Sequence, residues 1–277
     1  MSFGAKIVPM ELRHCALEAL QADEPLHKVS LVKQIWLDRA TLVTDRTREL
    51  SPAQGSVPGR PQKPELIDAR GMPKRSAFNT EGLATLVHAV CHIEFNAINL
   101  ALDALWRYPN MPQRYYDDWL KVAYEESTHF ELLRELLESL GYHYGSFQAH
   151  DGLWDMCTKT AHSVTARMAL VPRTLEARGL DVTPVIQKKL QSAGSPDAKR
   201  ATEILDIILR DEVGHVAIGN YWFNWLCDEQ GVEPTQYYAE LAREHKAPKP
   251  RPPFNLEARQ RAGFTQQELK ALEIAGQ

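Results

Sequence analysis

The chain has 277 residues, of which 44% are hydrophobic and 25% are charged, and its formal net charge is −4. These values are ordinary for a globular protein. No apolar run approaches the roughly 18 residues that a membrane-spanning helix requires, and the N-terminal residues lack the apolar core of a secretory signal. We therefore expect a cytoplasmic protein with no membrane partner. The negative charge weighs against nucleic acid as a partner but leaves that alternative open.

The cysteines are four in number, widely spaced, and form no CxxC pair. Three of them, Cys91, Cys157 and Cys227, lie within stretches of helical pattern. We expect reduced thiols, which are usual in a reducing compartment. The alternative is a structural disulfide.

Two kinds of segment open the chain. Residues 9–50 place apolar side chains at helical spacing, which predicts helix. Residues 51–80 are rich in proline and glycine, which predicts a long irregular segment over the surface. We interpret residues 1–79 as a helical and irregular extension that packs on the rest of the chain.

Four long helices are predicted next, at residues 80–106, 112–140, 152–178 and 196–230. Thr80 is the expected N-cap of the first helix. Ser195, followed by proline, marks the start of the fourth. Gly179 should end the third helix, and a short excursion should follow it. Pro172 should kink the third helix, because proline lacks a backbone N–H.

The remaining residues, 231–277, form a tail that is first proline-rich and then weakly helical. We expect it to pack on the helices rather than form a domain. No convincing strand pattern occurs in the sequence. The fold class predicted is all-α, with the four long helices of residues 80–230 at its centre.

The motif Glu-x-x-His carries the chemistry. Chance predicts about one occurrence in such a chain, and the sequence has four: Glu11–His14, Glu24–His27, Glu126–His129 and Glu212–His215. The first two have no special context. The last two share the local pattern acid-Glu-x-x-His-apolar, and both lie on the apolar stripe of a predicted helix, where an i, i+3 pair points the same way.

The other two long helices each carry a single acid on the apolar face, Glu94 in the first and Glu176 in the third. One Glu from each of two helices and Glu-x-x-His from each of two others is the ligand set of di-iron carboxylate bundles. Glu94 and Glu126 also lie about equally far from the turn near Asn110, which would place both carboxylates at one height.

We therefore predict a di-metal site. Its six ligands are Glu94, Glu126, His129, Glu176, Glu212 and His215. Four buried carboxylates repel one another, and two divalent cations would neutralise them. Carboxylate and imidazole suit iron or manganese, so we expect two iron ions, with manganese or a mixed pair as alternatives. Asp211 and Glu125 are candidate acceptors for the imidazole N–H groups. The competing interpretation is a metal-free core of hydrogen-bonded Glu–His pairs.

The ligand pattern resembles the ferritin-like superfamily over residues 80–230. More closely, the segments HIEFNAINLALDAL, EESTHF, ALVPRTLEARGLD and DEVGHVAIGNYWF resemble a bacterial ferritin-like family of unknown function, as do the flanking PGRPQKPEL and PKPRPPFN. The resemblance implies a ferritin-like four-helix bundle with an N-terminal extension and a proline-rich C-terminal tail. It also implies the six ligands above. A more distant similarity is to the di-iron enzyme that hydroxylates a modified tRNA base.

The function expected is an oxygenase or oxidase that activates O₂ at two irons and acts on an unidentified substrate, as a monomer or small homo-oligomer. The long segments outside the bundle fit a substrate pocket better than a storage shell. The alternatives are an iron-handling ferroxidase or storage protein, a metal-stabilised binding module without turnover, and a dimanganese catalase. The sequence identifies neither the electron donor nor any catalytic residue beyond the ligands.

Overall fold

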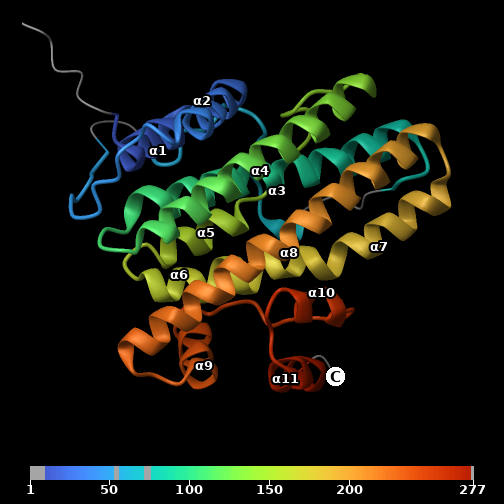
Figure 1. Ribbon diagram of the computed structural model, residues 1–277. Coiled ribbons are helices and arrows are strands. Elements are labelled where there is room, and N and C mark those ends of the chain that lie inside the picture. Colours follow the sequence, from blue (N-terminus) through green and yellow to red (C-terminus); the bar gives the residue numbers. More distant parts are fainter. Residues whose placement is uncertain (1–9, 53–55, 72–75, 276–277) are drawn as a thin grey trace, which may run out of the picture. The chain divides into compact units, whose positions relative to one another are not determined.

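The computed structural model describes residues 10–52, 56–71 and 76–275 (Figure 1). This described part consists of helices and irregular segments, with two isolated β-bridges and no β-strand. The predicted all-α class is therefore confirmed. The helices are α1 (Leu12–Gln21), α2 (Pro25–Asp38), the 3₁₀ turn η1 (Ala69–Gly71), α3 (Thr80–Arg107), α4 (Gln113–Ser139), α5 (Gly152–Lys159), α6 (Val164–Leu170), the π-helix η2 (Val171–Glu176), α7 (Ala177–Ala193), α8 (Pro196–Gln230), α9 (Pro234–Glu244), α10 (Leu256–Arg261) and α11 (Gln266–Ala275).

Contacts between backbone positions divide the chain into two compact units. The first contains residues 1–62 and 97–127, and the second contains residues 63–96 and 128–277. α3 and α4 are continuous helices, and each runs through the division.

In the first unit, α1 and α2 begin in the same way. The carboxylates of Glu11 and Glu24 each accept hydrogen bonds from two backbone N–H groups of the helix that follows. Such caps satisfy donors that have no partner inside the helix.

The predicted helix over residues 39–50 is wrong, because α2 ends at Asp38 and the following residues are irregular. The carboxylate of Asp45 accepts from the backbone N–H groups of Thr47 and Arg48. The buried guanidinium of Arg13 binds the carbonyls of Asp45 and Arg48. These bonds replace those that a helix would make.

The predicted helices at residues 80–106 and 112–140 are confirmed as α3 and α4. The cap of α3 differs from the prediction. The side chain of Asn79, rather than that of Thr80, accepts the N–H of Gly82 at 2.7 Å. Asparagine is a strong N-cap because its short side chain reaches the first-turn donors.

α3 is long and apolar enough to cross a membrane when judged by length and composition alone. However, 89% of its most apolar stretch is buried inside the protein. This burial is typical of a core helix.

The third long helix is the main departure from the prediction. α5 ends at Lys159, and α6 starts after Ser163, whose hydroxyl accepts the N–H of Ala166 at 3.2 Å. α6 then passes into η2, which contains Pro172, so the backbone takes a π-helical turn where the proline lacks its N–H donor. Gly179 does not end the helix, because α7 continues to Ala193.

The fourth predicted helix is confirmed as α8, with the same bounds. The Ser195 hydroxyl accepts the N–H of Ala198 at 3.1 Å, as expected for an N-cap before proline. At the other end Gly231 takes a φ of 66°. Its left-handed conformation lets the N–H of Val232 reach the carbonyl of Cys227 at 3.0 Å, which closes the helix.

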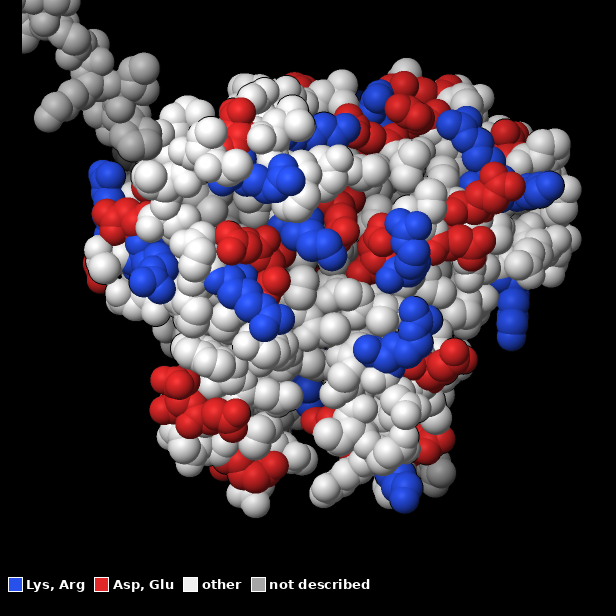
Figure 2. Space-filling view, in the orientation of Figure 1, with Lys and Arg blue, Asp and Glu red and all other residues white. Residues whose placement is uncertain are grey.

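The C-terminal tail is more helical than its sequence indicated, since α9, α10 and α11 lie within it. Only the stretch between α9 and α10, from His245 to Asn255, is irregular and proline-rich. Basic and acidic side chains lie interspersed over the face of the molecule shown in Figure 2.

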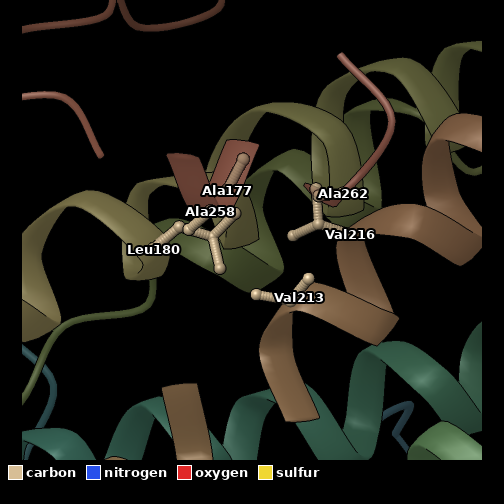
Figure 3. Close-up of a cluster of buried hydrophobic side chains, with 6 residues drawn as sticks. All are labelled: Ala177, Leu180, Val213, Val216, Ala258 and Ala262. Atoms are coloured by element: carbon tan, nitrogen blue, oxygen red, sulfur yellow. The ribbon is translucent and has the colours of Figure 1, made fainter. Parts of the chain in front are cut away.

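α7 packs along α8, and α10 packs against both of them. A cluster of small buried side chains fills the space between these three elements (Figure 3). Its members are Ala177, Leu180, Val213, Val216, Ala258 and Ala262. Small side chains allow helices to approach closely, so the end of the chain is part of the core of the second unit.

All four cysteines are free thiols, as expected. Cys91, Cys157 and Cys227 are buried. Burial raises the pKa of the Cys227 thiol to about 11.

Candidate metal centre

All six predicted ligands are buried, and none exposes more than 9% of its surface. They are Glu94, Glu126, His129, Glu176, Glu212 and His215. Buried carboxylates are costly unless a proton, a cation or a set of hydrogen bonds compensates their charge. The structure thus concentrates in its interior four groups that need such compensation.

His129 on α4 lies between two carboxylates of the second unit. Its Nδ1 is 3.2 Å from Oε2 of Glu94 on α3, and its Nε2 is 3.1 Å from Oδ2 of Asp211 on α8. A neutral imidazole carries one proton, so it can donate to only one of these carboxylates. The other side then presents a nitrogen lone pair to a carboxylate oxygen.

Asp211 is held as a carboxylate acceptor beside Nε2. Asp211 also pairs with the exposed Arg210, whose Nε lies 2.8 Å from Oδ1. Burial acts to raise the pKa of Asp211, but hydrogen bonds from His129 and Arg210 outweigh it and hold the pKa below its usual value. If the proton of a neutral His129 lies on Nε2, it donates to Asp211 and the Nδ1 lone pair is directed toward Glu94, which is an arrangement that binds a cation.

On α8, Glu212 and His215 are one helical turn apart. His215 Nδ1 lies 3.6 Å from Oε1 of Glu212. The imidazole ring of His215 also lies close to that of His129, with 6.0 Å between the ring centroids. The two Glu-x-x-His motifs therefore bring their imidazoles together within the second unit.

Glu126 lies on the unbroken helix α4, three residues before His129, and is fully buried. It belongs to the first unit. In the second unit, two groups of buried side chains could hold a metal ion: Glu94 with His129, and Glu212 with His215.

Glu176 is the last residue of η2 and is buried, but it belongs to neither of these groups among the described residues. Its position follows from the π-helical turn. The N–H of Ala177 donates to the carbonyl of Pro172, five residues earlier, as it does in a π-helix.

The two predicted acceptors of imidazole protons have different surroundings. Asp211 lies at hydrogen-bond distance from His129. Glu125 is partly exposed and lies 3.4 Å from Lys121 Nζ on the same helix.

The buried Glu and His side chains are compatible with metal binding. Carboxylate oxygen and imidazole nitrogen bind iron, manganese and zinc, whereas thiolates would favour zinc or iron–sulfur clusters. The protein would hold one ion with Glu94 and His129 and another with Glu212 and His215.

Several residues near these ligands were not identified from the sequence. Gly219 on α8 touches Pro172 of η2, and a Cβ at position 219 would lie 2.5 Å from Pro172 Cβ. Arg173 is buried beside it. The only sequence signals were a proline and an arginine within an apolar helical stretch.

Comparisons with known proteins give a family without an assigned function. A protein-family model described as "Protein of unknown function (DUF455)" matches residues 21–270. A protein of Haemophilus influenzae, described as an uncharacterized protein, is 46% identical over 262 residues, which is 91% of this chain and 90% of that protein. No solved structure matches the chain.

Proposed function

We propose that this chain, which belongs to the DUF455 family of proteins of unknown function, is a di-iron carboxylate protein that activates O₂ and oxidises a substrate. One observation carries the proposal: the buried imidazole of His129 lies between the carboxylates of Glu94 and Asp211, beside the second Glu-x-x-His pair. With the His129 proton on Nε2, the Nδ1 lone pair would face the Glu94 carboxylate at 3.2 Å, and a metal ion between such groups would account for the pairing.

The fold that we propose around this site is a ferritin-like four-helix bundle. Its helices would be α3, α4, α8 and the stretch from α6 through η2 to α7. Each contributes at least one of the six ligands. This distribution is the one found in di-iron carboxylate bundles.

Two ferrous ions would supply electrons to O₂. The chain's own residues do the rest. The four glutamates offset the positive charge of two divalent cations, because their formal charges are equal and opposite. Asp211 holds the Nε2 proton of His129 and thereby fixes the orientation of its ring. The near-complete burial of the six side chains keeps bulk water from the site.

Other metals and other uses of the site remain as outcomes of the test. Manganese suits the same donors. An iron store and a non-catalytic binding module would use the same ligands without oxidising a separate substrate.

The test is O₂ uptake by protein loaded anaerobically with ferrous iron. We expect rapid uptake of O₂ by the wild type and by Glu203→Gln, which changes an exposed residue of α8. Glu212→Gln should abolish it. Bound iron that consumes no O₂ would contradict an oxidase and indicate an inert module. A very large particle in size-exclusion chromatography, together with accumulation of many irons per chain, would indicate storage instead.

A further inference from the structure

The π-helical turn η2 is held from one side by α8. A Cβ on Gly219 would lie 2.5 Å from Pro172 Cβ and 2.6 Å from its Cγ, so only glycine at this position permits the contact. Gly219 follows His215 by one turn of α8 and lies on the same face. The ligand-bearing face of α8 and the turn that carries Glu176 are thus in direct contact.

η2 is also held through its own residue Arg173, which is 5% exposed. Its guanidinium donates to the side-chain oxygen of Asn220 and to Oε1 of Glu268. It also lies over three aromatic rings, 4.8–5.3 Å from their centroids: those of Phe223, Tyr238 and Phe264. A buried arginine with so many partners has one position, and it fixes the backbone that carries it.

Glu268 joins this arginine to the C-terminal segment. Its other oxygen, Oε2, accepts the N–H of Thr265 at 2.7 Å, and its own N–H donates to the Thr265 hydroxyl at 3.2 Å. This is a capping box at the start of α11. One carboxylate therefore both starts α11 and binds Arg173.

The same segment is anchored a second time through α10. Arg259 forms a buried ion pair with Asp181, with Nη2 at 2.7 Å from Oδ2. Asn220, which accepts from Arg173, also donates to the carbonyl of Ala262 at 2.7 Å. The segment from Asn255 to the end of α11 is therefore bonded to η2, α7 and α8, the elements that carry or flank Glu176.

We infer that Arg173, held by Glu268 of the C-terminal segment, is a positioning residue for the metal ligand Glu176. The inference rests on the proposed metal site. In this arrangement the tail sets the register of the π-helical turn, and the turn sets the position of the carboxylate three residues after Arg173. If the tail were detached, the other ligands would stay in place and the affinity for one of the two metal ions would fall.

The decisive variant is Glu268→Gln, because glutamine retains the capping box but loses the charge that holds Arg173. Glu273→Gln is the matched control, an exposed glutamate on the same helix α11. The probe is Co²⁺, titrated into metal-free protein against a competing chelator and followed by its d–d absorption. We expect Glu268→Gln to bind the second Co²⁺ roughly tenfold more weakly than wild type and to shift its spectrum, as for residues that orient a ligand.

A second measurement needs no metal. The N–H of Ala177 donates to the carbonyl of Pro172 within η2. Amide hydrogen exchange at Ala177 in the metal-free protein should therefore be about tenfold faster in Glu268→Gln than in Glu273→Gln.

Arg173→Lys should retain more of the wild-type Co²⁺ spectrum than Arg173→Met, because lysine keeps a positive charge for Glu268.

The two proposals fail differently. The positioning role alone would be overturned if the wild type binds two Co²⁺ ions and the variants Glu268→Gln and Glu273→Gln do not differ in Co²⁺ affinity, spectrum or amide exchange. A wild type that binds no Co²⁺ would overturn the metal site, and the positioning role would fall with it.

Discussion

His129 of α4 and Asp211 of α8 lie 3.1 Å apart, measured between Nε2 of the imidazole and Oδ2 of the carboxylate. The contact joins the two Glu-x-x-His motifs, because Asp211 immediately precedes Glu212. It gives a role to the acid that precedes the second motif, because Asp211 contacts the histidine of the first motif. The residue before Glu126, in contrast, contacts Lys121 on its own helix.

Asp211→Leu removes the acceptor of the His129 Nε2 proton. We expect metal affinity to fall about 10–100-fold, because the imidazole loses the partner that fixes its tautomer and orientation. Asp228→Asn, on an exposed position of the same helix, is the control and should bind as wild type does. The measurement is competition with a chromogenic chelator. Equal affinities for the two variants would rule out a role of Asp211 in holding His129.

Gly219→Ala should destabilise the fold by about 1–3 kcal/mol, the usual cost of overpacking. The added methyl group would meet Pro172, and the ring cannot move without shifting η2. Gly214→Ala is the matched control on α8, since its Cβ would meet nothing within 4 Å. That variant should be more stable by about 0.5–1 kcal/mol, because alanine favours helix.

Chemical denaturation of the two glycine variants distinguishes the effect of the Gly219–Pro172 contact from the effect of helix propensity. Opposite signs of the change in unfolding free energy support the close contact of η2 and α8. A stabilised Gly219→Ala would show that the contact is absent in solution.

Arg259→Met should cost about 3–5 kcal/mol, because it removes the buried partner of the Asp181 carboxylate and leaves only Arg178, which is partly exposed and 3.5 Å away. Arg261→Met is the control, as Arg261 lies on the same helix α10 but is exposed. The measurement is the melting temperature of each variant in thermal unfolding. Similar melting temperatures for both variants would show that α10 contributes little to the second unit.

The burial of Lys28 should make the stability of the fold depend on pH. Its ammonium is buried and donates to the Leu20 carbonyl at 2.6 Å. Burial, aided by the charge of Arg60, lowers the pKa of Lys28 from 10.5 to about 7. The unfolded chain therefore binds a proton that the folded chain releases between these values. The free-energy cost of burying the charged Lys28 ammonium is fully present below pH 7, so the free energy of unfolding should rise as the pH rises toward 10.5.

Lys28→Met should remove this rise, whereas Lys199→Met, at an exposed position of α8, should keep it. The quantity to compare is the unfolding free energy from urea titrations between about pH 7 and about pH 10. Parallel curves for the wild type and Lys28→Met would contradict a neutralised lysine at this position.

The sequence was sufficient to locate helices whose ends carry local signals. α8 has Ser195 and a proline at its start and Gly231 at its end, and its predicted bounds are those observed. The stripe that carries Glu212 and His215 is equally local, since it depends only on the period of the helix. Burial of both side chains follows from the apolar residues on either side of them.

Features that depend on distant parts of the chain were not predictable. The break after Lys159 has no glycine or proline to mark it. Gly179 looked like a helix end, but α7 continues because Ala177 and Leu180 are packed against α8 and α10. The π-helical turn at Pro172 needs Gly219, which lies 47 residues later in the chain.

The most direct test of the central claim is the metal content of protein purified under native conditions, measured beside the double variant Glu126→Ala/Glu212→Ala. Glu203→Ala, at an exposed position of α8, serves as the control. We expect about two iron ions per chain in the wild type and the control, because two divalent cations neutralise four carboxylates, and we expect their loss in the double variant. A wild type that carries no transition metal and takes up none from added ferrous iron would contradict the site and leave a helical protein whose interior Glu and His side chains compensate one another.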